Sequence, residues 1–547
     1  MKKLIFLALG CSLLFAPSCK DFLEKNPTAS PSEAIFWQSK NDFDQALTAI
    51  YTGVRGGISF KQSLTTGYIS SYISFWDNMS DNSIEANTNV SGASVVLTDQ
   101  ITPTYFPTFG GIYSYCYSNI ARINIFLSRL DEYFEDKTDE SYIQLKGEAV
   151  GLRGLLYYYL YVCFGEVPVT KEAPVVENMY VDKSDREAVY KAVVEDFNEA
   201  ATLLGTNETY MNRPGRMTGA AATAFCARTM LYHAYDDKGV AKKAEMEEVL
   251  TKLNTITAPY SLATDVLDNF HSSKQSACPE IMFSLRYLKP TMRNQIDYLV
   301  GDQKAILPTR DLVYDFPMAD GNTAFDPSTV ANIDKMYDKT ITEAERLAIY
   351  DAIFANRDPR LAKFITHNDV YDFSAYLPDN VANAVTSGNN SATYFDVFKL
   401  VTPIDNAEGG WNQGYDWQGD QDAVLLRWAH VLLMKAEAAF ESGDETGAKN
   451  YINEMRRGYG IPELTSIDRD ILRREIRIET CFEGLRYFDM KRWRILDKMN
   501  GKVQDPSMPN VSKVIVNPAH FDWPIPQDQI DVYEDNGHTL TQNPNYK

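Results

Sequence analysis

Glutamates and arginines alternate near the C-terminus in a spacing that could support acid–base chemistry. Glu475, Glu479 and Glu483 recur at every fourth residue. The arginines that interleave with them are Arg473, Arg474, Arg477 and Arg486. Two carboxylates can act as the acid and base of a glycoside hydrolase, but neighbours on one helix lie close together and flanking arginines keep them ionised. A general acid needs a raised pKa, so we interpret residues 473–486 as one helix carrying a structural ion-pair network.

Two further segments combine aromatic rings with amides and carboxylates, the mixture that carbohydrate recognition requires. A flat ring stacks on the C–H face of a sugar, while amides and carboxylates hydrogen-bond its hydroxyl groups. The candidate contacts are Tyr68, Tyr72, Trp76, Asp77, Asn78, Asp81, Trp411, Tyr415 and Trp417. Alternatively, the rings only pin long loops onto the scaffold. For Tyr68 and Tyr72, one helical turn apart, the two interpretations stay equal, whereas for Trp411 and Trp417, flanked by glycines and amides, we favour ligand contact.

Other catalytic signatures are absent from the sequence. The six histidines are dispersed, and no HExxH, G-x-S-x-G, Walker or G-x-G-x-x-G motif occurs. We therefore predict no catalytic residue, metal or cofactor. Arg153, beside Tyr157 to Tyr159, is expected to pair with a buried acid. The chain has 53 Lys and Arg against 74 Asp and Glu, a net charge of −21 that disfavours a nucleic-acid partner.

The N-terminus is typical of a lipoprotein signal. Two lysines precede an apolar run over residues 4–15, and small or turn-forming residues then lead to Cys19. The run is too short to span a bilayer, so residues 1–18 are expected to be a cleaved signal and Cys19 the lipidated residue. Cys11 is a competing acceptor, although it would leave a short signal core, and an ordinary secretory signal is the remaining alternative. Cys163, Cys226 and Cys481 occupy apolar helix positions and are expected in the core.

Hydrophobic periodicity predicts a mainly helical protein in which loop-rich insertions interrupt the helices. The expected helices span residues 39–51, 112–133, 142–164, 186–204, 218–235, 242–255, 341–355, 423–441, 445–457 and 467–499. Short strands are expected at 281–285 and 394–400. Long irregular insertions are expected at 59–109 and 261–420, with an extended tail over 500–547. Neighbouring helices of this length, joined by short breaks, favour a tetratricopeptide-like arrangement.

Several segments, taken in order, resemble the SusD/RagB family. Gly147-Glu148-Ala149 with Arg153 and Tyr157, followed by Gly165 and Pro168, resembles the "GEA…R…Y…GdvP" signature of that family. Later matches are Arg427-Trp428-Ala429 with Ala436-Glu437-Ala438, Asn453-Glu454 with Arg456-Arg457, Arg474 to Glu479 with Phe482 to Asp489, Pro524-Ile525-Pro526, and Gln542-Asn543-Pro544. Asn545 departs from the usual glycine of the terminal turn. The resemblance covers essentially the whole chain after Cys19.

The resemblance implies a four-unit tetratricopeptide scaffold with inserted loops and a few short β-hairpins. It divides the chain into an N-terminal region, 19–260, and a RagB/SusD domain, 261–547. It also implies a lipid-anchored protein on the outer face of the outer membrane that binds a glycan and passes it to a SusC-like TonB-dependent transporter. The alternatives are a peptide or glycoprotein ligand for the same module, or a surface glycoside hydrolase.

Overall fold

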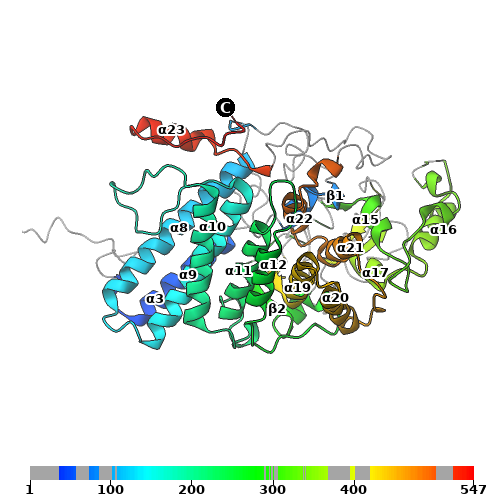
Figure 1. Ribbon diagram of the computed structural model, residues 1–547, viewed down its shortest axis with the longest axis horizontal. Coiled ribbons are helices and arrows are strands. Elements are labelled where there is room, and N and C mark those ends of the chain that lie inside the picture. The colour runs from blue at the N-terminus through cyan, green and yellow to red at the C-terminus, as the bar shows by residue number, and fades with distance from the viewer. Residues whose placement is uncertain are drawn as a thin grey trace, which may run out of the picture.

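The computed structural model describes residues 36–546 apart from certain segments. These segments are 57–72, 85–101, 105–106, 337, 339, 401–418, 500–520 and, with isolated exceptions, 289–305 and 368–394. Within the described residues the protein is mainly helical, as predicted, and its helices pack side by side along one long body (Figure 1). The described strands are short and occur only in pairs.

The N-terminal half is a series of helices that pack against their neighbours in sequence. They are α3 (Lys40–Arg55), α8 (Pro107–Tyr133), α9 (Glu140–Phe164), α10 (Arg186–Leu204), α11 (Gly219–His233) and α12 (Lys243–Leu253). Side-chain caps fix several starts: Asp185 accepts from Ala188 N at α10, and Thr218 accepts from Ala221 N at α11. Each of these predicted helices is confirmed to within a few residues, apart from α8, which starts five residues earlier than expected.

Small residues let α9 and α10 approach closely. Gly147, Gly151 and Gly154 all lie on the α9 face that packs against α10. A Cβ atom added at Gly147 would lie 2.7 Å from Leu204, and one at Gly154 would lie 3.2 Å from Phe197. A larger residue at these positions would therefore force the two helices apart.

The C-terminal half continues the same packing. It contains α19 (Trp428–Ser442), α20 (Glu445–Gly458), α21 (Arg469–Thr480) and α22 (Arg486–Arg492). Helix α19 packs against both α12 and α20, which joins the two halves of the sequence into one scaffold. The last helix, α23 (Gln527–Asp535), lies on the outside of the body near the C-terminus (Figure 1).

Within the part of the chain that the structure describes, three antiparallel strand pairs join distant segments. They are β1 (Ser83–Ile84) with β3 (Leu307–Pro308), β2 (Ile281–Leu285) with β6 (Ala423–Arg427), and β4 (Ile365–His367) with β5 (Phe395–Val397). Short helices fill the remaining described chain: α5 (Ile73–Asn78), α13 (Ser272–Gln275), α15 (Arg310–Asp315), α16 (Glu343–Phe354) and α17 (Pro359–Phe364). Single 3₁₀ turns are η3 (Tyr210–Asn212), η4 (Val266–Asn269), η5 (Pro327–Thr329), η6 (Ile333–Lys335) and η8 (Leu496–Met499).

Two predicted helices are wrong in part. The first five residues of the expected helix 423–441 form strand β6, because they pair with β2 from a distant part of the chain. The expected helix 467–499 is broken after Thr480, where Phe482 and Gly484 adopt positive φ angles of 65° and 74°. Positive φ is unusual for phenylalanine, and the fully buried Phe482 ring is packed in the second hydrophobic cluster, which stabilises this turn.

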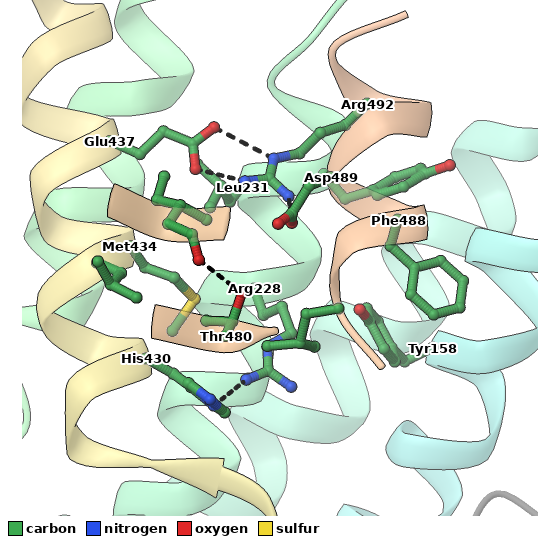
Figure 2. A pocket seen from close by; sticks show the side chains of 14 residues that line it. Tyr158, Arg228, Leu231, His430, Met434, Glu437, Thr480, Phe488, Asp489 and Arg492 are labelled. Atoms are coloured by element: carbon green, nitrogen blue, oxygen red, sulfur yellow. Dashed lines mark hydrogen bonds and ion pairs between the residues drawn. The ribbon is translucent and has the colours of Figure 1, made fainter. Parts of the chain in front are cut away.

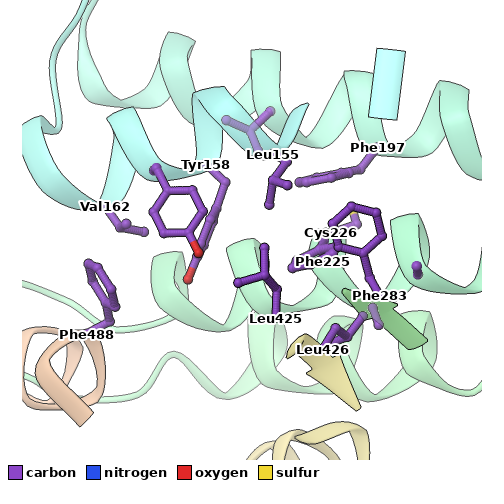
Figure 3. Close-up of a cluster of buried hydrophobic side chains, with 14 of the residues drawn as sticks. Leu155, Tyr158, Val162, Phe197, Phe225, Cys226, Phe283, Leu425, Leu426 and Phe488 are labelled. Carbon is purple, nitrogen blue, oxygen red and sulfur yellow. The ribbon is translucent and has the colours of Figure 1, made fainter. Parts of the chain in front are cut away.

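The hydrophobic core lies between the helices and the β2–β6 pair. Figure 3 shows its centre, where Leu155 and Phe197 meet Phe225, Phe283 and Leu426 from the opposite side. A second cluster surrounds Phe316, Tyr350 and Phe364 in the C-terminal half. The predicted core cysteines Cys163, Cys226 and Cys481 are buried as free thiols, as expected.

Candidate functional site

The glutamates of the C-terminal motif meet Arg427 inside the scaffold. Arg427 ends strand β6, immediately precedes helix α19 and is fully buried. Its Nη1 atom lies 2.8 Å from Glu280 Oε1 and 2.9 Å from Glu479 Oε1, while its Nη2 atom lies 2.6 Å from Glu483 Oε1. One guanidinium therefore contacts three carboxylates, one from Glu280 and two from residues 479–483. Its pair with Glu483, through Nε and Nη2, is bidentate, the geometry in which Arg forms its strongest ion pairs.

A second arginine extends this network. Arg360 Nη2 lies 2.9 Å from Asp358 Oδ2 and 3.0 Å from Glu475 Oε2, and its Nη1 lies 3.1 Å from Glu479 Oε2. Arg456 pairs with Glu475 at 2.7 Å, and Lys399 donates to Glu483 at 2.6 Å. We call this set, with Arg427 and its carboxylates, the ion cluster.

The electrostatics of the ion cluster are unsuited to proton transfer. Burial alone would raise the pKa of Glu483, but Arg427 and Lys399 outweigh it and hold the pKa well below the usual range. Burial lowers the pKa of His430, which contacts Glu483, to about 3, so this imidazole is neutral. A general acid needs a raised pKa and access to substrate. Glu483 has neither, and the other carboxylates of the ion cluster are buried away from any substrate.

The predicted ion-pair network is thus confirmed, but its geometry differs from the prediction. Glu483 and Arg486 do not share a helix with Glu475, because α21 ends at Thr480. The main partners of the glutamates are Arg360 and Arg427 rather than the interleaved arginines, two of which bind Asp81 instead. Arg153 also behaves as predicted: its Nε and Nη2 atoms each donate to the buried Asp196 at 2.9 Å.

The structure corrects the first predicted ligand segment. Trp76 is only 2% exposed and stacks on Trp523 with ring centroids 5.4 Å apart. Asp77 is fully buried and accepts hydrogen bonds from Asn82 Nδ2 at 2.8 Å and Gly484 N at 2.7 Å. Asn78 is buried and accepts from Ser83 Oγ. These three residues pack α5 onto the turn before α22, so a ligand in solution cannot reach them in this structure.

Asp81, from the same segment, lies at the edge of the scaffold. Its side chain is 20% exposed, and its two carboxylate oxygens accept from Arg486 at 2.7 and 2.8 Å. A bidentate arginine partner explains this carboxylate without a ligand. The other predicted contacts, Tyr68, Tyr72, Trp411, Tyr415 and Trp417, lie outside the described residues, as does Cys19.

The flanks of these two undescribed segments meet on one short stretch of chain, which the sequence did not indicate. Arg55, at the end of α3 and just before residues 57–72, donates through Nη1 to Arg286 O at 3.1 Å and lies 5.5 Å from the Tyr287 ring. Gly419, just after residues 401–418, forms two backbone hydrogen bonds with Asn294, at 2.8 and 2.9 Å. We call Arg286 to Asn294 the junction stretch.

A cavity of about 50 Å³ lies between α9, α11, α19, α21 and α22. Figure 2 shows its polar wall, where Arg492 pairs with Glu437 and Arg228 contacts His430. Small-molecule pockets occupy about 300–1,000 Å³, so this cavity has room for a few waters and is too small for a sugar. Among the described residues, no group of three His, Cys, Asp or Glu side chains is arranged to hold a metal ion, and none of the helices is long and apolar enough to cross a membrane.

Comparison with known proteins identifies both halves of the chain. A model described as the SusD family matches residues 301–546, and one described as starch-binding proteins associating with the outer membrane matches residues 21–231. The SusD-like protein P25 of Formosa agariphila is 25% identical, covering 96% of this chain and 95% of the relative.

Solved structures share the fold. The crystal structure of a SusD-like carbohydrate-binding protein from Bacteroides fragilis superposes with a TM-score of 0.71 at 22% identity, covering 91% of this chain and 99% of that one. A laminarin-binding SusD-like protein superposes with a TM-score of 0.65 at 18% identity, covering 92% and 99%. These likenesses run through both halves of the scaffold and agree with the two family models, and the protein accordingly belongs to the SusD/RagB family.

Proposed function

We propose that this protein binds an oligosaccharide or polysaccharide outside the outer membrane and delivers it to a SusC-like TonB-dependent transporter. Two structural neighbours described as carbohydrate-binding and laminarin-binding support the ligand class. The matching family of starch-binding proteins that associate with the outer membrane supports the location. Lipidation at Cys19, the residue that follows the apolar signal, would provide the anchor.

The ligand surface of this proposal is formed by the segments that contain Tyr68 and Tyr72 and Trp411, Tyr415 and Trp417. The observation that carries it is the junction stretch: the chain enters residues 57–72 from Arg55 and leaves residues 401–418 at Gly419, and both ends hydrogen-bond to Arg286 to Asn294. A salt bridge between Arg286 and Asp422, 3.0 Å long, further ties this stretch to the second flank. Shared anchoring favours one combined surface over two separate ones.

The proposal assigns no catalytic step to the protein. The densest carboxylate cluster is buried and fully ion-paired, so it can stabilise the scaffold but cannot protonate a glycosidic oxygen. A hydrolase would instead require two accessible carboxylates on opposite sides of a bound sugar.

The direct test is a glycan array with the soluble protein lacking residues 1–19, followed by calorimetric titration of the best ligand. Saturable binding to a glycan, without release of reducing sugar over time, is the expected result. Binding to peptides but to no glycan would show that the ligand is a peptide. Steady release of reducing sugar would show that the protein is a hydrolase. Absence of binding to any glycan contradicts the proposal.

The anchor is tested separately in cells. Cys19→Ala should abolish palmitate labelling and release the protein from the membrane fraction, because no thiol remains at the processing site. Cys11→Ala is the matched control and should leave both unchanged. Full labelling of the Cys19 variant would move the acceptor to Cys11.

A further inference from the structure

One surface of the scaffold exposes an unusual concentration of apolar side chains. Within the described residues nine large apolar side chains are exposed, and four of them lie in the loop between α9 and α10. These are Val175, Val176, Met179 and Val181, and Val176 is 77% exposed. A fifth, Val532, lies on α23, which packs against this loop. We call these five residues the apolar face. Clustered exposed apolar groups mark interaction sites more often than chance exposure does.

The loop is held in place by its own polar groups, which leaves its apolar groups outside. Asn178 closes a turn by accepting from Val175 N at 2.8 Å and donating to Ala173 O at 3.1 Å. Asp182 accepts from both Thr541 N and Thr541 Oγ1 at 2.8 Å. Lys183 pairs with Glu166 at 2.5 Å. Turning the valines inward would break these hydrogen bonds and this ion pair, so the polar contacts of the loop stabilise the conformation in which the valines are exposed.

Aromatic contacts fix the loop to α23. The Tyr180 ring stacks on His538 with centroids 4.6 Å apart and meets Tyr533 edge-on at 5.2 Å. Tyr533 Oη also donates to Val181 O at 3.2 Å. Figure 1 shows α23 on the outer side of the body, and the contacts of Tyr533 and His538 place this loop beside it. The apolar face is therefore preformed, which lowers the entropic cost of binding a partner.

The rim of the apolar face is acidic. The exposed acids of the two segments are Glu172, Glu177, Asp182, Asp185, Asp528, Asp531, Glu534 and Asp535. Their only lysines are already paired: Lys171 with Glu195 and Asp196, and Lys183 with Glu166. An acidic rim repels a second copy of this chain and an anionic lipid surface, and it attracts a basic one.

We propose that the apolar face docks a protein partner whose contact surface has an apolar centre and a basic rim. The inference rests on the proposed function, in which that partner is the outer-membrane transporter. An apolar centre within a charged rim is the usual anatomy of a protein–protein interface, with the affinity at the centre and the orientation set by the rim.

The test uses the full lipidated protein, tagged and co-expressed with its transporter, and measures how much transporter co-purifies from detergent-solubilised membranes. Val176→Asp with Met179→Asp should reduce it about tenfold or more, because charge enters the apolar centre. Val240→Asp, at a similarly exposed valine between α11 and α12, is the matched control and should change nothing. Asp531→Lys with Glu534→Lys should also reduce it, with a smaller effect at high salt.

Each outcome decides between occupants. Equal co-purification of the Val176/Met179 variant and wild type overturns the inference. Self-association of the soluble protein in sedimentation equilibrium, or its binding to anionic phospholipid vesicles, abolished by the same variant, assigns the face to another occupant and also overturns it. No transporter with wild type overturns both the inference and the delivery step. Loss of glycan binding in wild type, with co-purification intact, would sink only the proposed ligand.

Discussion

Two segments far apart in the sequence, 73–84 and 473–486, are equally rich in residues that resemble a functional site, and they lie against each other. Gly484 N donates to Asp77, and Arg486 and Arg477 bind Asp81. The glutamate segment was predicted to be structural and is so, whereas the aromatic segment was predicted to bind ligand and is buried at Trp76 to Asn78. The comparison teaches that residue type alone does not separate a binding platform from a scaffold joint.

The two segments differ in whether the sequence near each polar group indicates the kind of partner that it has. Arginines close to Glu475 and Glu479 in the sequence indicated that these carboxylates are ion-paired, although the actual partners are Arg360, Arg427 and Arg456. Asp77 has no local cation, and its partners are backbone and amide donors that only the folded chain supplies. Four predictions sharpen this difference.

The largest effect is expected in the ion cluster. Arg427→Met should lower the free energy of unfolding by about 3–5 kcal/mol, because it removes the cation that pairs with the buried Glu280 and one of the two cations that pair with each of Glu479 and Glu483. Arg457→Met is the matched control, since its pair with Glu463 is exposed, and it should cost at most about 1 kcal/mol. Urea unfolding monitored by circular dichroism measures both, and equal effects would contradict a cluster that stabilises the fold.

The aromatic segment should respond next in size. Trp76→Ala should cost about 3–4 kcal/mol, because it removes a buried ring from between Trp523 and Phe488. Glycan affinity of the folded fraction should stay unchanged. Conversely, a loss of affinity without a change in melting temperature would restore Trp76 to the ligand surface.

The pKa shifts of Asp77 and Glu483 have opposite signs, so the two residues should make stability depend on pH in opposite directions. Burial raises the pKa of Asp77 from 3.8 to about 6, so the folded state retains a proton that the unfolded chain has lost, and stability falls as pH rises from about 4 to about 6. The fall is about 2–3 kcal/mol, at about 1.4 kcal/mol per pKa unit. The pKa of Glu483 is lowered in the folded protein, so this residue contributes stability at pH values above its pKa in the unfolded chain. That stability is lost as the pH falls toward the folded pKa.

The measurement is the stability of wild type and Asp77→Asn between pH 4 and pH 7. Because asparagine cannot ionise, the variant should lack the fall assigned to Asp77, although it loses a hydrogen bond at every pH. Parallel profiles for the two proteins would show that Asp77 does not titrate in this window.

The smallest effect is expected at the predicted ligand surface. Trp417→Ala should weaken glycan binding about tenfold, or about 1.4 kcal/mol, because a stacked ring is lost, and should leave the melting temperature unchanged. Tyr451→Ala, a partly exposed ring on α20, is the control and should leave the affinity unchanged. A fall in melting temperature that matches the loss of affinity would support loop pinning instead.

Most helices, and the assignment of the glutamates to ion pairs, follow from patterns that are local in the sequence. Helices such as α10 and α11 depend on periodicity, an N-cap and a local stop, all of which act within a few residues. The ion-pair role of Glu479 is likewise indicated locally, because Arg474 and Arg477 lie close to it in the sequence.

Which partners meet, and which side chains are covered, depends on contacts between segments that are far apart in the sequence. Arg360 lies 115 residues before Glu475, and strand β6 exists because Ala423 to Arg427 meet β2, so no local pattern could specify either. The segment around Trp76 has the composition of a surface loop. Burial depends on what packs over a residue, and here α22 and Trp523 cover the Trp76 ring. Local free energies select the elements, and long-range packing selects their contacts.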